Sequence, residues 1–318
     1  MKKTWPILSY PDAKDTYETW HLWTQIIGKI KLAKLPWINH SWHVTFVVTP
    51  TGLTTGSLPD AQQSFQIDFN LIHHQLHITT QNGESRQFEL PGLSVASFYQ
   101  QVLTALGELG LEATINPVPN EMEEAIPFDQ DTEHKTYIPQ QATAFHQALL
   151  LAQDLLTQFR AGFLGKCSPV HFFWGGFDLA VTRFSGRKAP RHPGGVPHLP
   201  DWVAQEAYSH EVSSCGFWPG NAAFPAAAFY AYSYPEPPGY KDAPVAPQGA
   251  YYHPELREFI LPYELVQQSR DPEKAVLDFL HSTYGAAADL AHWDRENLEA
   301  GNLKQQVKPI QQAPASPG

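Results

Sequence analysis

Hydrophobic and polar residues alternate along the chain with two different periods. Over residues 12–34 apolar residues recur at helical spacing and lysines gather near the end, which predicts a helix with one apolar face. The following segments are short, rich in β-branched and aromatic residues, and separated by turn-forming pairs such as Asn82-Gly83. We expect antiparallel strands at 42–49, 64–71, 75–80 and 85–90. A helix capped by Ser94 and ending near Gly110 completes this first half.

The same order of elements returns in the second half of the chain. A long helix begins at Pro139, and strands are expected near 170–184, 206–217 and 227–234, followed by a hairpin over 251–262 and a helix over 271–293. His43 and His171 head matching strands, and Arg86 and Arg257 open matching stretches before a helix. The expected fold class is therefore α+β, with two similar halves, each a helix, an antiparallel sheet and a helix, related by internal duplication.

Composition marks the boundaries between these parts. A segment crowded with acidic residues and prolines separates the halves, and we interpret it as an acidic connection. The second half is longer because it carries loop insertions at 185–201 and 235–249, both rich in Pro and Gly. The end of the chain has the composition of a disordered tail. The predicted parts are the first half, the connection, the second half and the tail, at 1–116, 117–138, 139–296 and 297–318.

Charge and cysteine content narrow the classes of function. A net charge of -11 argues against nucleic acid or an anionic membrane surface as a partner. No run approaches the roughly 20 apolar residues of a membrane span, and Pro6 interrupts the start where a signal peptide needs an apolar run. Two cysteines in 318 residues do not form a disulfide framework. We expect a soluble cytoplasmic protein, and the sequence leaves its oligomeric state open.

A basic stretch in the second half is the main candidate for ligand binding. Between Asp178 and Asp201 there is no acidic residue, while arginines, histidines and the Gly194-Gly195 pair occur together. Guanidinium groups and consecutive glycine amides both suit a carboxylate or phosphate. The candidate ligand-binding residues are Trp174, Arg183, Arg187, Arg191, His192 and His198. The alternative is a basic surface loop that offsets the acidic connection by weak attraction.

Candidate catalytic residues lie on the strands that flank this stretch. His171 and His210 fall on neighbouring predicted strands, and on one face they would meet each other or Asp178 as an acid/base group. The alternative is a pair of hydrogen-bonded core histidines. Because no HExxH or paired CxxC spacing occurs, we assign no metal site. The glycines match no nucleotide-binding fingerprint, so the cofactor stays unknown.

Four strings of residues resemble those of a bacterial family catalogued only as a domain of unknown function. They are HLWTQ at 21–25, NHSWHV at 39–44, GKCSPVHFFWG at 165–175 and YSHEVSS at 208–214. The likeness runs from about Trp5 to Trp293. It implies a widespread soluble bacterial protein and supplies no activity, cofactor or catalytic residue.

These observations lead to one expectation and two alternatives about function. We expect a cytoplasmic enzyme that acts on a small anionic molecule in a pocket of the second half. In that hypothesis the arginines hold the anion, and His171, Asp178 and His210 transfer protons. The alternatives are a non-catalytic protein that binds or senses a small molecule in the same pocket, and a scaffold whose Pro-rich loops contact a partner protein. The sequence does not decide whether a reaction is catalysed.

Overall fold

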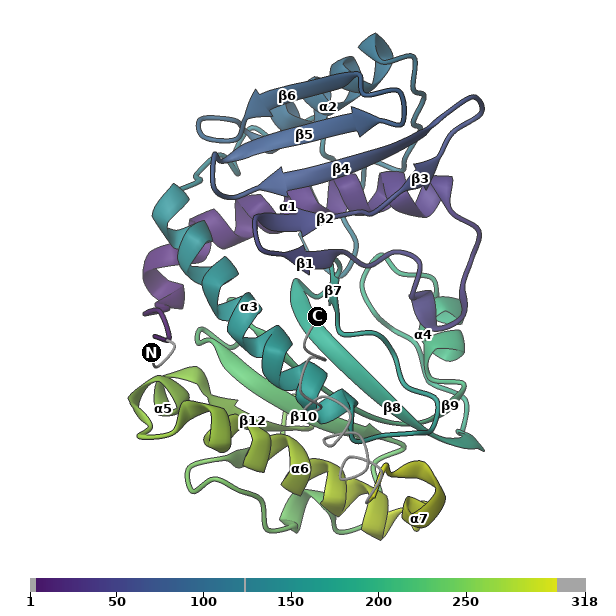
Figure 1. The fold of residues 1–318 in the computed structure, drawn as a ribbon, viewed down its shortest axis with the longest axis vertical. Coiled ribbons are helices and arrows are strands. Elements are labelled where there is room, and N and C mark those ends of the chain that lie inside the picture. Colours follow the sequence, from purple (N-terminus) through teal and green to yellow (C-terminus); the bar gives the residue numbers. More distant parts are fainter. Residues whose placement is uncertain (1–3, 123, 302–318) are drawn as a thin grey trace, which may run out of the picture.

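Two antiparallel sheets form the framework of the protein, and helices pack against them (Figure 1). The computed structural model describes residues 4–122 and 124–301. The predicted α+β class is confirmed. Most of the predicted disordered tail, residues 302–318, lies outside the described residues.

The first sheet follows the order β1-β2-β4-β5-β6, and β3 pairs with β4. Apolar and polar residues alternate along β4, so one face of the sheet is buried and the other is partly exposed. Helix α2 packs beside β6, and its N-cap Ser94 accepts a hydrogen bond from the Ser97 amide at 3.1 Å. The elements of this half are α1 (Tyr10–Lys34), η1 (Asn39–Ser41), β1 (Val47–Thr49), β2 (Gly52–Thr54), β3 (Leu58–Pro59), β4 (Ser64–Asn70), β5 (Gln75–Thr80), β6 (Ser85–Glu89) and α2 (Val95–Glu108).

The second sheet follows the order β11-β12-β10-β9-β8-β7. Helices α3 and α6 lie in front of it in Figure 1 and cover one of its faces. The elements of this half are α3 (Pro139–Arg160), β7 (His171–Phe173), β8 (Asp178–Lys188), α4 (Asp201–Ala207), β9 (His210–Trp218), β10 (Ala228–Tyr234), η2 (Tyr240–Asp242), β11 (Tyr251–His253), β12 (Glu258–Pro262), α5 (Tyr263–Gln268), α6 (Pro272–Leu290) and α7 (Arg295–Leu298).

The two sheets meet where the first strand of one lies beside the first strand of the other. Phe46, just before β1, forms an antiparallel bridge with Phe172 in β7. The amide of Phe46 donates to the Phe172 carbonyl at 2.8 Å, and the amide of Phe172 donates back at 2.9 Å. This pair of hydrogen bonds satisfies main-chain groups that a free sheet edge would leave unpaired.

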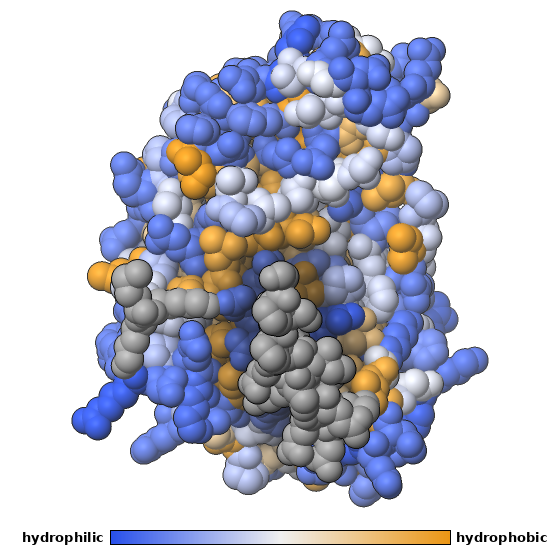
Figure 2. All heavy atoms as spheres, in the orientation of Figure 1, coloured by the Kyte–Doolittle hydropathy of each residue, from blue (hydrophilic) through white to orange (hydrophobic). Residues whose placement is uncertain are grey.

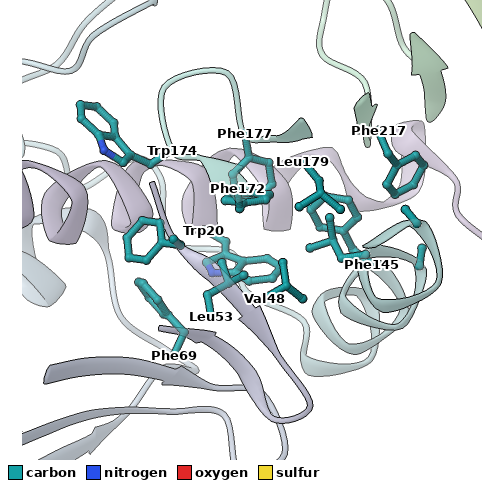
Figure 3. Close-up of a cluster of buried hydrophobic side chains, with 14 of the residues drawn as sticks. Trp20, Val48, Leu53, Phe69, Phe145, Phe172, Trp174, Phe177, Leu179 and Phe217 are labelled. Atoms are coloured by element: carbon teal, nitrogen blue, oxygen red, sulfur yellow. The ribbon is translucent and has the colours of Figure 1, made fainter. Parts of the chain in front are cut away.

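One apolar core extends across both halves of the chain. Trp20 in α1 and Phe145 in α3 are fully buried, and their rings meet edge to face with centroids 5.9 Å apart. Both rings also contact Phe177, at centroid distances of 5.4 Å and 5.5 Å. Figure 3 shows these rings with Val48 and Leu53 of the first half and Leu179 of the second. Packing of this kind couples the two halves.

Helix α1 differs from the sequence prediction, because it is buried on nearly all sides and not on one apolar face. Its polar side chains therefore need partners inside the protein. The ammonium group of Lys31 donates to the carbonyls of Thr45 and Thr55, at 2.5 Å and 2.6 Å. These bonds attach the helix to the start of the first sheet.

Two predicted strands are shorter than expected. The strand predicted over 42–49 begins only at Val47, because His40 and Ser41 adopt positive φ angles in η1 and the chain bends there. The strand predicted over 206–217 begins at His210, since the residues before it form α4. His43 therefore does not head a strand, and its Nδ1 accepts a hydrogen bond from the Ile38 amide at 3.2 Å.

From the joined edge outward, the first sheet runs β1-β2-β4-β5-β6 with β3 beside β4, whereas the second runs β7-β8-β9-β10-β12-β11, so the two strand orders differ at the outer strands. An origin by duplication stays a prediction.

Figure 2 shows hydrophilic residues over most of the visible face, with apolar residues gathered toward its middle. Among the described residues, no helix combines the length and the apolar character that a membrane crossing needs.

The shared core predicts that the two halves unfold together. Phe145→Ala removes a fully buried ring that contacts residues of both halves, so we expect the free energy of unfolding to fall by about 3–5 kcal/mol. Urea unfolding followed by circular dichroism and tryptophan fluorescence measures this. Ile72→Ala, at a side chain that is 57% exposed, is the control and should change stability by less than about 0.5 kcal/mol. Separate transitions for the two probes would contradict a shared core.

Candidate functional site

A large open cleft lies against the second sheet, on the face that α3 and α6 do not cover. Its volume is about 1340 Å³. Three parts of the chain line it: the N-terminal half of α1, the acidic connection, and the strands and loops of the second half. Most of the lining residues belong to the second half.

Strand β10 supplies an aromatic floor to the cleft. Tyr230 and Tyr232 point into it, while Phe229 and Ala231, which alternate with them, pack in the apolar core. Gly216 lies opposite Tyr230 on β9, and a Cβ atom there would lie only 2.4 Å from the Tyr230 hydroxyl. The absence of a side chain at Gly216 therefore lets Tyr230 reach across β9 toward Asp178 on β8.

Asp178 contributes a carboxyl group to the lining of the cleft. It is the first residue of β8 and follows a tight turn in which Phe177 has a positive φ angle of 55°. The Tyr230 hydroxyl donates a hydrogen bond to Asp178 Oδ2. Burial raises the pKa of Asp178 to about 6, although the Tyr230 hydrogen bond acts in the opposite direction by favouring the charged form.

Glu121 and Glu258 flank Asp178 with further unpaired carboxyl groups. Burial, and to a smaller extent repulsion from the Asp178 charge, raises the pKa of Glu121 to about 7 and that of Glu258 to about 8. Glu121 is exposed to solvent inside the cleft, and the protein that crowds around it there raises its pKa. Within residues 4–122 and 124–301, neither carboxyl group has a hydrogen-bond or ion-pair partner.

Contacts with glycine fix the position of Glu121. Its Oε1 lies 2.0 Å from where a Cβ atom of Gly175 would stand, so any side chain at Gly175 would displace the carboxyl group. The Glu121 amide donates to the carbonyl of Pro197 at 2.9 Å, which joins the connection to the loop before α4. Glu121 is held here with a positive φ angle of 61°.

A polar stripe on α1 holds the connection in place. Gln25 is fully buried; its Nε2 donates to the carbonyl of Asn120 at 2.9 Å and its Oε1 accepts from the Asn120 amide at 2.8 Å. One turn further on, Lys29 donates to the carbonyl of Val118 at 2.7 Å. One turn earlier, His21 lies 2.8 Å from the carbonyl of Gly175. This stripe places Glu121, next to Asn120, at the wall of the cleft.

A cluster of hydrogen-bonded and stacked rings forms the opposite wall. The hydroxyls of Tyr208 and Tyr232 lie 2.7 Å apart and hydrogen-bond. His192 stacks on Tyr208 with centroids 4.8 Å apart, and Tyr234 packs against the edge of the same ring at 5.2 Å. These rings offer flat faces to a ligand.

The predicted catalytic trio does not converge on one centre. His171 is buried away from the cleft, where its Nδ1 lies 3.0 Å from the Thr45 hydroxyl, and burial lowers its pKa to about 3. His210 pairs with Lys188 at the opposite end of β8 from Asp178, about 30 Å away at the rise of an extended strand. General acid/base groups must reach one reacting centre, so His171 and His210 cannot act with Asp178.

The predicted anion-binding arginines also lie apart from the cleft. Arg183 is 2% exposed, and its guanidinium group packs on Phe159 and donates to the carbonyl of that residue. Arg187 pairs with Glu211 at 2.6 Å. Arg191 is exposed and donates to the Gln205 side chain at 2.9 Å. Each arginine has an internal partner, so the three do not form one anion site.

The remaining predicted ligand-binding residues have different positions. His192 lines the cleft. His198 is exposed, and its carbonyl accepts a hydrogen bond from the Asn120 side chain. Trp174 is buried against α1 at Gly28, where a Cβ atom would lie 2.3 Å from the indole ring. Of the consecutive glycine amides that were predicted to bind an anion, the Gly195 amide already has a partner within the chain, because it donates to the Asp201 carboxylate at 2.9 Å.

Of the predicted site residues, Asp178 and His192 line the cleft, and Glu121, Glu258 and Tyr230 line it without having been among them. Glu121 was interpreted only as part of an acidic connection. The alternation along β10 was the available signal for Tyr230, because tyrosines recur there at every second position. Among the described residues, no group of three or more His, Cys, Asp or Glu side chains is placed to hold a metal ion.

The bond between Tyr230 and Asp178 leads to a prediction about titration. Tyr230→Phe removes the donor that favours the charged carboxylate, so the pKa of Asp178 should rise from about 6 by about one unit. Carbon-13 NMR of the carboxyl groups across pH 4–9 measures this. Tyr251→Phe, an exposed tyrosine outside the cleft, is the control and should leave the titration unchanged. An unchanged pKa in Tyr230→Phe would show that the bond does not stabilise the carboxylate.

Comparisons with known proteins place the chain in a family. No curated protein and no solved structure was found to match it. The model of a family of unknown function, DUF5996, matches residues 5–300, which include both sheets and every residue of the cleft described above. The chain therefore belongs to the DUF5996 family.

Proposed function

We propose that the cleft is the active site of an enzyme that transfers protons between its carboxyl groups and a small molecule. The supporting observation is that Glu121, Asp178 and Glu258 share one cleft and have pKa values raised to about 7, 6 and 8. Acid/base catalysts work best when their pKa lies near the working pH, and perturbed groups in a cleft are typical of active sites.

The order of the pKa values suggests a role for each group. Near pH 7, Asp178 is mainly a carboxylate and suits a general base, with Tyr230 orienting it. Glu258 keeps its proton at that pH and suits a general acid. Glu121 has a pKa of about 7, between those of Asp178 and Glu258, and it faces both residues from the acidic connection. Carboxyl groups whose environments separate their pKa values are the usual basis of such a division.

The size and charge of the cleft bear on the substrate. A volume of about 1340 Å³ accommodates a small molecule. The anionic substrate expected from the sequence has no support here, because the predicted arginines lie elsewhere and carboxyl groups line the walls.

Cys167 and Cys215 are both free, which suits the proposed cytoplasmic setting.

An unbiased search for turnover tests the proposal. The full chain is incubated with a fractionated extract of cellular metabolites, and mass spectrometry follows the loss of compounds and the appearance of products. We expect at least one conversion, with Asp178→Asn and Glu258→Gln each lowering its rate at least a hundredfold. Glu255→Gln, an exposed site three residues from Glu258 and outside the cleft, is the control.

The pH profile of any conversion should reflect the same groups. The value of kcat/KM should fall below about pH 6 as Asp178 gains a proton and above about pH 8 as Glu258 loses one. A compound that binds and is returned unchanged would instead support the alternative of a non-catalytic binding protein.

Glu258 should also make stability depend on pH. Its folded pKa of about 8 lies above the unfolded value near 4.3, so between these pH values the folded state retains a proton that the unfolded state has lost. The free energy of unfolding therefore falls as the pH rises through this window. Glu258→Gln should gain about 1–2 kcal/mol over wild type at pH 9, after allowance for solvent in the open cleft, and nothing at pH 4. Urea unfolding at both pH values measures this, and an equal effect at pH 4 would refute it.

A further inference from the structure

Carboxyl groups dominate the charge of the cleft. Among the described residues that line it, Arg257 is the one Arg or Lys, and it is exposed and lies 3.9 Å from Glu236. The acidic residues of the lining are Glu18, Glu121, Glu124, Glu133, Asp178, Glu236 and Glu258. A cleft with walls of one charge concentrates the field, so it attracts cations and repels anions.

The histidines of the lining do not offset this charge. Burial lowers the pKa of His21 to about 4 and also lowers that of His192, so both are neutral at pH 7. His134 lies 2.7 Å from Asp131, whose carboxylate already partners it. The acidic side chains of the cleft therefore have almost no internal cation to balance them.

Aromatic rings add a second attraction for positive charge. The rings of Tyr230 and Tyr232 lie nearly parallel, with centroids 6.2 Å apart and planes inclined by 15°. Trp218 lines the same cleft and stacks on Phe224 at 5.5 Å. The face of an aromatic ring is negative, and it attracts an ammonium or guanidinium group while also packing against apolar carbon. A metal ion would use no such surface.

We propose that the substrate is a small organic cation, an amine or guanidine carried on an apolar or ring-bearing body. This inference rests on the proposed function. Its charged group would lie among Asp178, Glu121 and Glu258, and its body would lie on the tyrosine rings. This arrangement would supply Glu121 and Glu258 with the partner that they lack in the described part of the chain.

Three probes with one ring and different charge test the substrate class. Binding of benzylamine, benzyl alcohol and benzoate to the full chain is measured by isothermal titration calorimetry or ligand-observed NMR at pH 7.5. We expect benzylamine to bind at least tenfold more tightly than benzyl alcohol, and benzoate to bind least. Higher salt should weaken only the binding of benzylamine. Benzylamine binding that is no tighter than that of the neutral or anionic probe would overturn the inference.

Variants locate the binding site of the cation. Asp178→Asn and Glu121→Gln should each weaken benzylamine binding at least threefold and affect benzyl alcohol binding less, and circular dichroism checks that both variants are folded. Glu255→Gln, outside the cleft, should leave both unchanged. Unaltered benzylamine binding in both cleft variants would also overturn the inference.

The outcome of this experiment is separate from that of the turnover search. A clear preference for benzylamine without any metabolite conversion would refute the proposed enzyme and retain the cationic ligand. Conversion of a neutral or anionic metabolite would retain the enzyme and refute the cationic substrate.

Discussion

Burial of α1 on nearly all sides is the constraint on which the rest of the structure depends. Its apolar residues, led by Trp20, complete a core that both halves share. The polar residues of its buried middle, such as Gln25, Lys29 and Lys31, are shielded from bulk water, and a buried polar group without a partner costs about 1–3 kcal/mol. Gln25, Lys29 and Lys31 therefore bind main-chain groups of other segments. The helix thus fixes both the start of the first sheet and the course of the acidic connection.

The cleft follows from this attachment. Because Gln25 holds Asn120 by two hydrogen bonds, the next residue, Glu121, comes to lie against Gly175 at the edge of the second sheet. A segment whose charge suggests a solvated linker is instead a wall of a cavity. Its carboxyl group keeps contact with solvent in the cleft, but protein crowds around it and it has no partner among the described residues. Groups kept in such an environment are typical of sites that act on a ligand.

The sequence predicted the elements better than the site, for a physical reason. Periodicity is local, so β5 was predicted with the bounds that the structure shows, and the helix beginning at Pro139 was also found. A site is assembled from distant segments, and nothing in the local pattern links Glu121 to Glu258. The arginines illustrate the converse. They are close in sequence, but the strand register shifts between Phe184 and Lys188, and Arg183 packs on Phe159 of α3 while Arg187 pairs with Glu211.

The difference between the two sheets lies in what covers them. On the first sheet, the outward side chains of Gln66 and Asp68 hydrogen-bond to each other at 2.9 Å and face solvent. On the second sheet, the outward tyrosines of β10 face a cleft, because the connection and the loop before α4 cover that side and are joined by the bond from Glu121 to Pro197. The position of the cleft therefore depends on the segments that cover this face of the second sheet. His43 and His171 lie outside this cleft and have hydrogen-bond partners elsewhere in the chain, whereas Glu121 and Glu258 line the cleft and have none among the described residues.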